Sequence, residues 1–268
     1  PPVLFLHGFP EFWWAWRHQL GAVADSGHAG WALDVRGAGA SDKPPSGYDL
    51  VTACADASGV IRSLGAESAV IVGHGLGASV AWLMPYLAPK VTRAVAVIGM
   101  DHPVVSRRAL ARSRLDRDKG GSRELPRRWV SEKVLASDPT AVLTILRECA
   151  APTGRWPSLD EAQRYAEAMR LPMAARGPAE KQRWVLRASL TSQGWSLARR
   201  IAGPVTVPTL LVRGASDPLL SAERAERSAA HVVGPLATVT VPDAGHFTHE
   251  EAPDVVSAAL VDWLRTIP

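Results

Sequence analysis

The stretch Val72-Gly73-His74-Gly75-Leu76-Gly77-Ala78 decides how this chain of 268 residues is interpreted. It follows the apolar run Ala69–Val72 and leads into the amphipathic stretch Ala78–Leu87, so it predicts a strand, a sharp turn and a helix. Small residues two before and two after Gly75 allow the chain to pack closely around a strained central residue. In enzymes such a turn presents a nucleophile, but glycine offers no atom that can attack.

Short β-branched runs alternate with amphipathic stretches on both sides of the middle of the chain. This alternation indicates βαβ units, and therefore an α/β fold with a mostly parallel sheet and helices on both faces. We expect strands at Val3–Leu6, Trp31–Asp34, Ala69–Val72, Val95–Ile98, Thr209–Val212 and Ala237–Val241. We expect helices at Phe12–Ala24, Leu50–Leu64, Ala78–Leu87 and Pro253–Arg265.

The alternation stops after His102-Pro103 and resumes only with the strand that begins at Thr209. Between them, Val104–Ala202 offers only helical periods, which are broken by Pro126, Pro139, Pro152 and Pro172. The sequence therefore predicts one α/β core, residues 1–103 and 204–268, with an inserted helical cap at residues 104–203. We find no internal repeat.

Composition and charge limit the partners of the chain. Apolar residues make up 47% of the sequence and charged residues 21%, which fits a globular protein and excludes general disorder. The formal charge is only +4, and the basic stretch Arg107–Arg128 is interleaved with acidic residues, which favours a solvated helix over a nucleic-acid surface. We see no apolar run of membrane-spanning length and no leader peptide, so we expect a cytoplasmic protein without membrane or nucleic-acid partners.

Metals and cofactors are not indicated. Cys54 and Cys149 lack metal-ligand spacing and are expected to be buried thiols in a reducing compartment. The Gly-rich stretch Asp34–Pro44 lacks the glycine spacing and the following helix of a dinucleotide-binding loop. We therefore expect neither a metal nor a cofactor, and the sequence does not indicate an oligomeric state.

Two polar residues lie just beyond the last two predicted strands. Asp217 follows Thr209–Val212, and His246 follows Ala237–Val241. Because the carboxyl ends of parallel strands meet at one edge of a sheet, we expect Asp217 and His246 to lie within hydrogen-bonding reach. The carboxylate would then fix the tautomer of the imidazole, as in a catalytic dyad.

Several runs together resemble the epoxide hydrolase and haloalkane dehalogenase branch of the α/β-hydrolase superfamily, over nearly the whole chain. They are His7-Gly8-Phe9-Pro10-Glu11, Trp14-Ala15-Trp16-Arg17-His18, Asp34–Pro45, the turn at Gly75 and Gly245–Pro253. The order of turn, acid and histidine along the chain is also that of α/β hydrolases. The resemblance implies an α/β-hydrolase fold, an acid at Asp217, a base at His246, and oxyanion donors on the backbone of Phe9 and Leu76.

In that family an aspartate at the centre of the turn forms an ester with the substrate, and two cap tyrosines donate hydrogen bonds to the epoxide oxygen. Here the corresponding positions hold Gly75, Tyr165 and Gln182, and Lys181 precedes Gln182. The expected pocket is apolar, and its candidate substrate-binding residues are Trp14, His74, Asp101, Tyr165 and Gln182. Relatives usually carry a β-hairpin before the first strand, so we expect either a truncated sequence or a fold without those edge strands.

Three hypotheses about function remain. The first is an enzyme that acts on a small apolar molecule without a covalent intermediate, with His246 as general base and Asp101 as a possible extra carboxylate. The second is a noncatalytic pseudoenzyme that binds such a ligand. The third is an epoxide hydrolase whose nucleophile has been replaced. The Asp217 and His246 pair favours the first.

Overall fold

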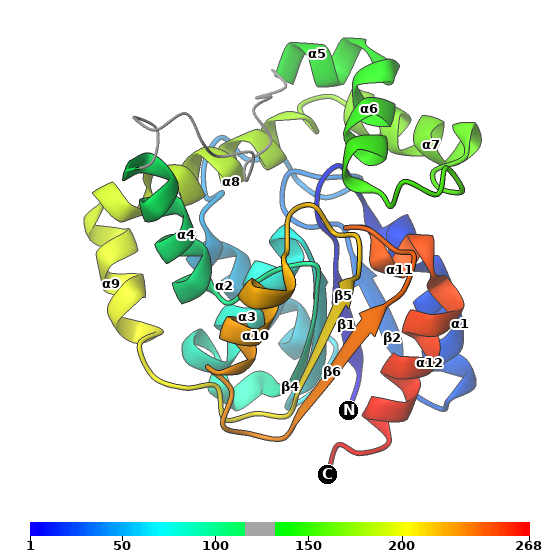
Figure 1. Cartoon of the computed structure of the whole chain (residues 1–268). Helices are drawn as coiled ribbons and strands as arrows, with labels where there is room; N and C mark the ends of the chain where they lie inside the picture. The colour runs from blue at the N-terminus through cyan, green and yellow to red at the C-terminus, as the bar shows by residue number, and fades with distance from the viewer. Residues whose placement is uncertain (116–131) are drawn as a thin grey trace.

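A single six-stranded sheet organises the computed structural model, which describes residues 1–115 and 132–268 (Figure 1). The strand order is β2-β1-β3-β4-β5-β6, and every neighbouring pair is parallel. The strands are β1 (Val3–Leu6), β2 (Gly30–Leu33), β3 (Ala69–His74), β4 (Thr92–Ile98), β5 (Thr209–Gly214) and β6 (Leu236–Val241). The predicted α/β fold with a parallel sheet is therefore confirmed.

Helices cover both faces of this sheet. One face carries α2 (Leu50–Ser63), α3 (Leu76–Leu87) and α10 (Ala222–Ala229), and the other carries α1 (Arg17–Asp25) and α12 (Pro253–Leu264) (Figure 1). Successive side chains of a strand point to opposite faces, so Leu4 and Leu6 join the core beneath α3 while Val3 and Phe5 join the core beneath α12. A sheet buried on both faces explains why its central strands are apolar throughout.

Six α-helices lie between β4 and β5 in the part of the chain that the structure describes. They are α4 (Pro103–Leu115), α5 (Glu132–Ser137), α6 (Pro139–Cys149), α7 (Leu159–Arg170), α8 (Arg176–Arg187) and α9 (Ser192–Arg200). Figure 1 shows α5, α6 and α7 above the ends at which the strands finish. Local sequence explains where two of these helices begin. Pro139 occupies the first turn of α6, and Ser158 forms a capping box with Glu161 at the start of α7. The division into a core and a cap at residues 104–203 stays a prediction.

The described residues also form several short elements. They are the 3-10 turns η1 (Trp13–Trp16), η2 (Pro89–Val91) and η4 (Ala188–Leu190), and the helix α11 (Thr248–Glu251). Within the described ranges, no helix is both long and apolar enough to cross a membrane. Most of the basic stretch Arg107–Arg128, and Pro126 with it, lies outside the residues whose structure is described.

Both cysteines are buried free thiols, as predicted. Burial raises the pKa of Cys54 and of Cys149 to about 12, because a thiolate is poorly solvated in the interior. Neither thiol is therefore a candidate nucleophile at neutral pH.

Candidate functional site

The site is built where the strands end. The loops that follow β1, β3, β5 and β6 carry His7–Glu11, Gly75, Asp217 and His246, in that order. Parallel strands bring these four loops to the same edge of the sheet, which is where open α/β sheets place their ligands.

The turn between β3 and α3 is closely packed at both flanks and open at its centre. A Cβ on Gly73 would lie 2.3 Å from the carbonyl oxygen of Gly77, and one on Gly77 would lie 2.0 Å from that of Leu6, so both positions exclude a side chain. Gly75 adopts φ 52° and ψ −117°, which a residue with a side chain reaches only under strain. A Cβ there would meet only the Cα of Gly8 at 3.5 Å and Nε2 of His246 at 3.9 Å within 4 Å. The centre of the turn therefore has room for a Cβ, which would lie beside His246.

Asp217 and His246 form the expected pair. Nδ1 of His246 lies 3.1 Å from Oδ2 of Asp217, and only 8% of the His246 side chain and none of the Asp217 side chain is exposed. The other carboxylate oxygen of Asp217 accepts hydrogen bonds from the backbone N–H groups of Leu219 at 2.7 Å and Leu220 at 3.1 Å. The prediction that the two side chains lie within hydrogen-bonding reach is confirmed.

The carboxylate of Asp217 favours the His246 tautomer that carries its proton on Nδ1. Nε2 is then left to accept a proton, and it donates to or accepts from no residue in the described part of the chain. The ring is held from the backbone as well, because the N–H of His246 donates to the carbonyl of Cys149 at 2.8 Å. The pair can therefore act as a general base towards the open space at Gly75.

Two backbone N–H groups flank that space in the sequence. Leu76 is the first residue of α3, where N–H groups have no partner within the helix, and Phe9 follows Gly8 in the loop after β1. Neither N–H donates a hydrogen bond to another residue of the ranges 1–115 and 132–268. Their role as oxyanion donors stays a prediction.

A buried polar cluster that the sequence did not predict lies behind the turn. Oε2 of Glu11 accepts hydrogen bonds from the N–H of Gly8 and from Nδ1 of His74, each at 2.7 Å, while Oε1 lies 3.1 Å from Nε2 of His249. Burial opposes ionisation of Glu11, but its contacts with His74 and His249 outweigh burial and hold the pKa of Glu11 well below its usual range.

His74, which was predicted to bind substrate, belongs to this cluster. Its second ring nitrogen lies 3.0 Å from the carbonyl oxygen of His246, so both nitrogens are already bonded and the ring links three loops. Ligand atoms of Glu11, His74 and His249 all lie within 4.8 Å of one another, which is a metal-compatible set. Oε2 of Glu11 accepts two hydrogen bonds, whereas Oε1 of Glu11 and both ring nitrogens of His249 are buried without a hydrogen-bonding partner in the described part of the chain.

Tyr165 is also bonded, through its hydroxyl, to another side chain of the protein. It is fully buried on α7, its hydroxyl donates to Oε1 of Glu250, and Arg17 donates to the same oxygen at 2.7 Å. Burial raises the pKa of Glu250 to about 7, although Arg17 and Tyr165 act in the opposite direction. The ring of Tyr165 packs edge-on against Trp14, whose face lies 3.5 Å from the Arg17 guanidinium. In this arrangement Trp14 and Tyr165 share one cluster, in which the Tyr165 hydroxyl is bonded to Glu250.

The two remaining candidates for substrate binding are Asp101 and Gln182. Asp101 is buried, and its carboxylate accepts from Arg224 at 2.6 and 2.8 Å and from the Ser106 hydroxyl, so it is an ion-pair partner rather than a free carboxylate. Gln182 lies in α8, and its side chain is outside the described part of the structure. Its neighbour Lys181 is buried, and burial lowers the pKa of the amine to about 8.

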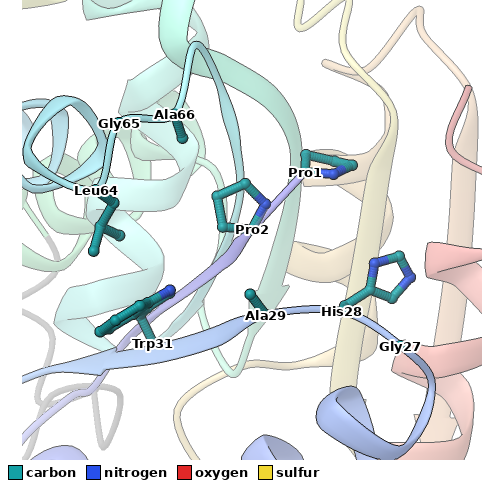
Figure 2. Close-up of a pocket in the computed structure, with 9 residues that line it drawn as sticks. All are labelled: Pro1, Pro2, Gly27, His28, Ala29, Trp31, Leu64, Gly65 and Ala66. Atoms are coloured by element: carbon teal, nitrogen blue, oxygen red, sulfur yellow. The ribbon is translucent and has the colours of Figure 1, made fainter.

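Two hollows of the molecule lie away from Gly75. One, of about 470 Å³, borders the edge strand β2 and is lined by Pro1, Pro2, Gly27, His28, Ala29, Trp31, Leu64, Gly65 and Ala66 (Figure 2). The other, of about 230 Å³, lies between α10 and strands β4 to β6. Neither is lined by Asp217 or His246. The apolar pocket expected above Gly75 stays a prediction.

Known proteins resemble this chain over most of its length. The profile of the family described as alpha/beta hydrolase fold matches residues 1–253. Epoxide hydrolase A of Mycobacterium tuberculosis (strain ATCC 25618 / H37Rv) is 30% identical over 98% of this chain and 90% of its own length, and epoxide hydrolase 4 of Mus musculus is 28% identical over 99% and 73%. The crystal structure of epoxide hydrolase A from Mycobacterium thermoresistibile aligns with a TM-score of 0.81 at 28% identity, covering 100% of this chain and 92% of that one.

Proposed function

Because this chain belongs to the family of the α/β-hydrolase fold, we propose that it is an epoxide-hydrolase-like enzyme in which Gly75 stands at the position of the nucleophile. The support is the turn between β3 and α3, whose flanking glycines exclude side chains while its centre has room for one. A hydrolase of this kind must act without an ester intermediate, because Gly75 has no attacking atom.

In the mechanism that we propose, His246 is the general base. Its Nδ1–H donates to Asp217, so the bare Nε2 takes a proton from a water molecule as the water oxygen attacks the electrophilic carbon of a small apolar substrate. The negative charge that develops on the substrate oxygen is stabilised by the N–H groups of Phe9 and Leu76. The protonated Nε2 of His246 then returns its proton to that oxygen, which restores the neutral base. We place the attacking water where a Cβ of residue 75 would stand, 3.5 Å from the Cα of Gly8 and 3.9 Å from Nε2 of His246.

One observation carries this proposal: Nε2 of His246 lies 3.9 Å from the point where a Cβ of residue 75 would stand. A base that is oriented by a carboxylate and that faces a vacant position is arranged to activate a molecule bound there. The remaining parts of the proposal are the helical cap at residues 104–203 and an apolar pocket beneath it. A cytoplasmic location rests on the two unpaired, buried thiols.

The second candidate function is a noncatalytic ligand-binding protein of the same fold, and a nucleophile-replaced epoxide hydrolase is a third. A specific observation favours the second: the hydroxyl of Tyr165 and the carboxylate of Asp101 are both bonded to other side chains. Neither is then free to donate a proton to a leaving oxygen. The binding alternative predicts that ligands stabilise the chain without being turned over.

The test is hydrolysis of a panel of epoxides and esters by the whole chain and by His246→Gln and Asp217→Asn. General-base catalysis typically contributes a factor of about 10² to 10⁴, so we expect each variant to lose at least a hundredfold in kcat/KM. His18→Gln is the control, because His18 is an exposed histidine on α1. Turnover that survives in His246→Gln would contradict the proposal, and ligand-induced stabilisation without turnover of the unchanged chain would support the binding alternative.

A further inference from the structure

Three buried side chains meet behind the turn at Gly75 without completing their hydrogen bonds. Glu11, His74 and His249 are each at most 1% exposed, and one ligand atom from each lies within 4.8 Å of the others. Oε1 of Glu11 and both ring nitrogens of His249 have no hydrogen-bonding partner in the described part of the chain, although Nε2 of His249 lies only 3.1 Å from Oε1. Buried polar atoms without a partner are costly, so these atoms indicate a group that the cluster binds.

The contacts of His74 indicate that this group is a cation. Nε2 of His74 lies 3.0 Å from the carbonyl oxygen of His246, which can only accept, so Nε2 carries a proton. Nδ1 lies 2.7 Å from Oε2 of Glu11, an acceptor that also receives the N–H of Gly8. A neutral ring with its proton on Nε2 presents a lone pair at Nδ1. The contact with Glu11 therefore needs a cation, which is either a second proton on the ring or a metal ion.

We propose that Glu11, His74 and His249 bind a divalent transition metal ion, with zinc as the best match. Two imidazole nitrogens and a carboxylate form a donor set that zinc accepts, whereas magnesium and calcium prefer oxygen donors alone. Donors lie about 2.0 to 2.2 Å from zinc, and therefore at most about 4.4 Å from one another. Since the donor atoms of the cluster already lie within 4.8 Å of one another, a small approach of the side chains completes the site.

The surroundings of the cluster also suit a metal site. Metal-bound histidines donate their other ring N–H to a carbonyl or carboxylate group, and His74 has this arrangement with the carbonyl of His246. The ring of Trp16 packs on His249 at 4.5 Å between centroids, which keeps that side of the site apolar. Glu11 follows β1, His74 ends β3 and His249 belongs to α11, so the ion joins three segments behind the proposed base. The sequence indicated no metal because these ligands are far apart in the chain and form no spacing motif.

Metal binding by the whole chain, after removal of bound metals with a chelator, tests this proposal. Because the three side chains are buried, each metal is incubated with the chain long enough for local opening. We expect one zinc ion per chain to remain after gel filtration, and Tm to rise by about 5 °C or more when zinc exceeds its Kd about a hundredfold. Magnesium should not raise Tm. Cobalt bound in this site should absorb visible light more strongly than hydrated cobalt, and zinc should abolish that band.

Matched variants locate the ion. Glu11→Gln and His249→Gln each remove one donor, so each should weaken zinc binding by at least about a hundredfold and abolish the cobalt band. His28→Gln is the control, because His28 borders the hollow beside β2 and should leave zinc binding unchanged. Glu11→Gln also disturbs two hydrogen bonds to its carboxylate, whereas the ring nitrogens of His249 make none. His249→Gln is therefore the decisive variant if Glu11→Gln does not fold.

Two results would overturn the proposal. If the unchanged chain binds no zinc, a second proton on His74 is the cation beside Glu11, and the cluster is held by hydrogen bonds alone. If His249→Gln binds zinc as tightly as the unchanged chain, the ion lies elsewhere. Neither measurement involves turnover, so both results leave the proposed function of His246 to its own test.

Discussion

Two properties of Gly75 differ from those of its neighbours Gly73 and Gly77. Its backbone conformation is one that glycine adopts without steric cost, yet its surroundings leave room for a Cβ, unlike those of Gly73 and Gly77. Packing therefore explains the two flanking glycines and does not explain the central one. The backbone conformation is what favours glycine at position 75.

The first prediction concerns Gly75→Asp, which places an aspartate at the centre of the turn. We expect this variant alone to remain a poor epoxide hydrolase, because ring opening also needs donors to the leaving oxygen. Losing one such donor costs on the order of 3 kcal/mol, about a hundredfold in rate, so two missing donors leave a deficit of about ten-thousandfold. The residues concerned are Tyr165, whose hydroxyl is bonded to Glu250, and Gln182, which stands where the resemblance to epoxide hydrolases implies a tyrosine.

The measurement compares turnover of styrene oxide by Gly75→Asp and by Gly75→Asp with Gln182→Tyr. We expect the second variant to be about a hundredfold faster. If Gly75→Asp alone already turns over at about 1 to 10 per second, which is ordinary for an enzyme, another group supplies the donors. Adding Tyr165→Phe to that active variant then shows whether the donor is Tyr165.

For single residues, the sequence predicts the positions of side chains that directly follow a strand. It does not predict contacts between loops that are far apart in the chain. Asp217 and His246 could be placed because each follows a strand of a parallel sheet, and such ends converge. Glu11 and His249 could not be placed, since their contact joins residues far apart in the chain and neither belongs to a motif with a fixed partner. The bond between Tyr165 and Glu250 was missed for the same reason, and it changes how Tyr165 is interpreted.

The elements themselves were largely predictable, because apolar periodicity reflects the burial that forms them. Boundaries shifted where that periodicity is interrupted. Strand β4 begins at Thr92 rather than Val95, since the exposed Arg93 breaks the apolar run although its backbone belongs to the strand. The predicted helix Phe12–Ala24 is the turn η1 followed by α1, a change of hydrogen-bond pattern that side-chain spacing does not reveal.

One tyrosine joins both ends of the helical insertion between β4 and β5. The hydroxyl of Tyr86, on α3, donates to the carbonyl of Gly203 at 2.9 Å and lies 3.1 Å from Nε2 of His102. His102 directly precedes α4, and Gly203 follows α9. A single side chain of α3 therefore contacts the residues at both ends of the insertion.

We predict that Tyr86→Phe lowers the free energy of unfolding by about 1 to 3 kcal/mol, because it leaves Nε2 of the buried His102 ring without its partner. It should also increase proteolysis within residues 103–203. Tyr48→Phe is a matched control, since the Tyr48 hydroxyl donates to the carbonyl of Pro44 within one loop. Urea denaturation and limited proteolysis provide the measurements. Equal proteolysis of the two variants would show that Tyr86 does not secure the insertion.

Across the whole molecule, burial shifts the pKa values of several ionisable groups, and the direction of the shift depends on the kind of group. Burial lowers the pKa of His7 to about 4 and that of His102 to about 3, the second with a further contribution from His231, whose ring stacks on it at 4.4 Å. Burial acts in the opposite sense on a carboxylate and raises the pKa of Glu250 to about 7. Stability must therefore depend on pH through opposing contributions.

The last prediction follows from the signs of these contributions. Between pH 4.5 and 6.5 an unfolded histidine binds a proton that buried His102 does not, so His102 makes stability rise with pH. Over the same range folded Glu250 holds a proton that its unfolded form has lost, so Glu250 makes stability fall as pH rises. Each proton changes the slope by about 1.4 kcal/mol per pH unit. Urea denaturation from pH 4.5 to 6.5 should therefore give a slope about 1.4 kcal/mol per unit smaller in His102→Gln and larger by the same amount in Glu250→Gln. Both variants break hydrogen bonds and lower stability at every pH, so the slope is the informative quantity. Parallel curves for the two variants and the unchanged chain would mean that neither group changes its protonation on unfolding.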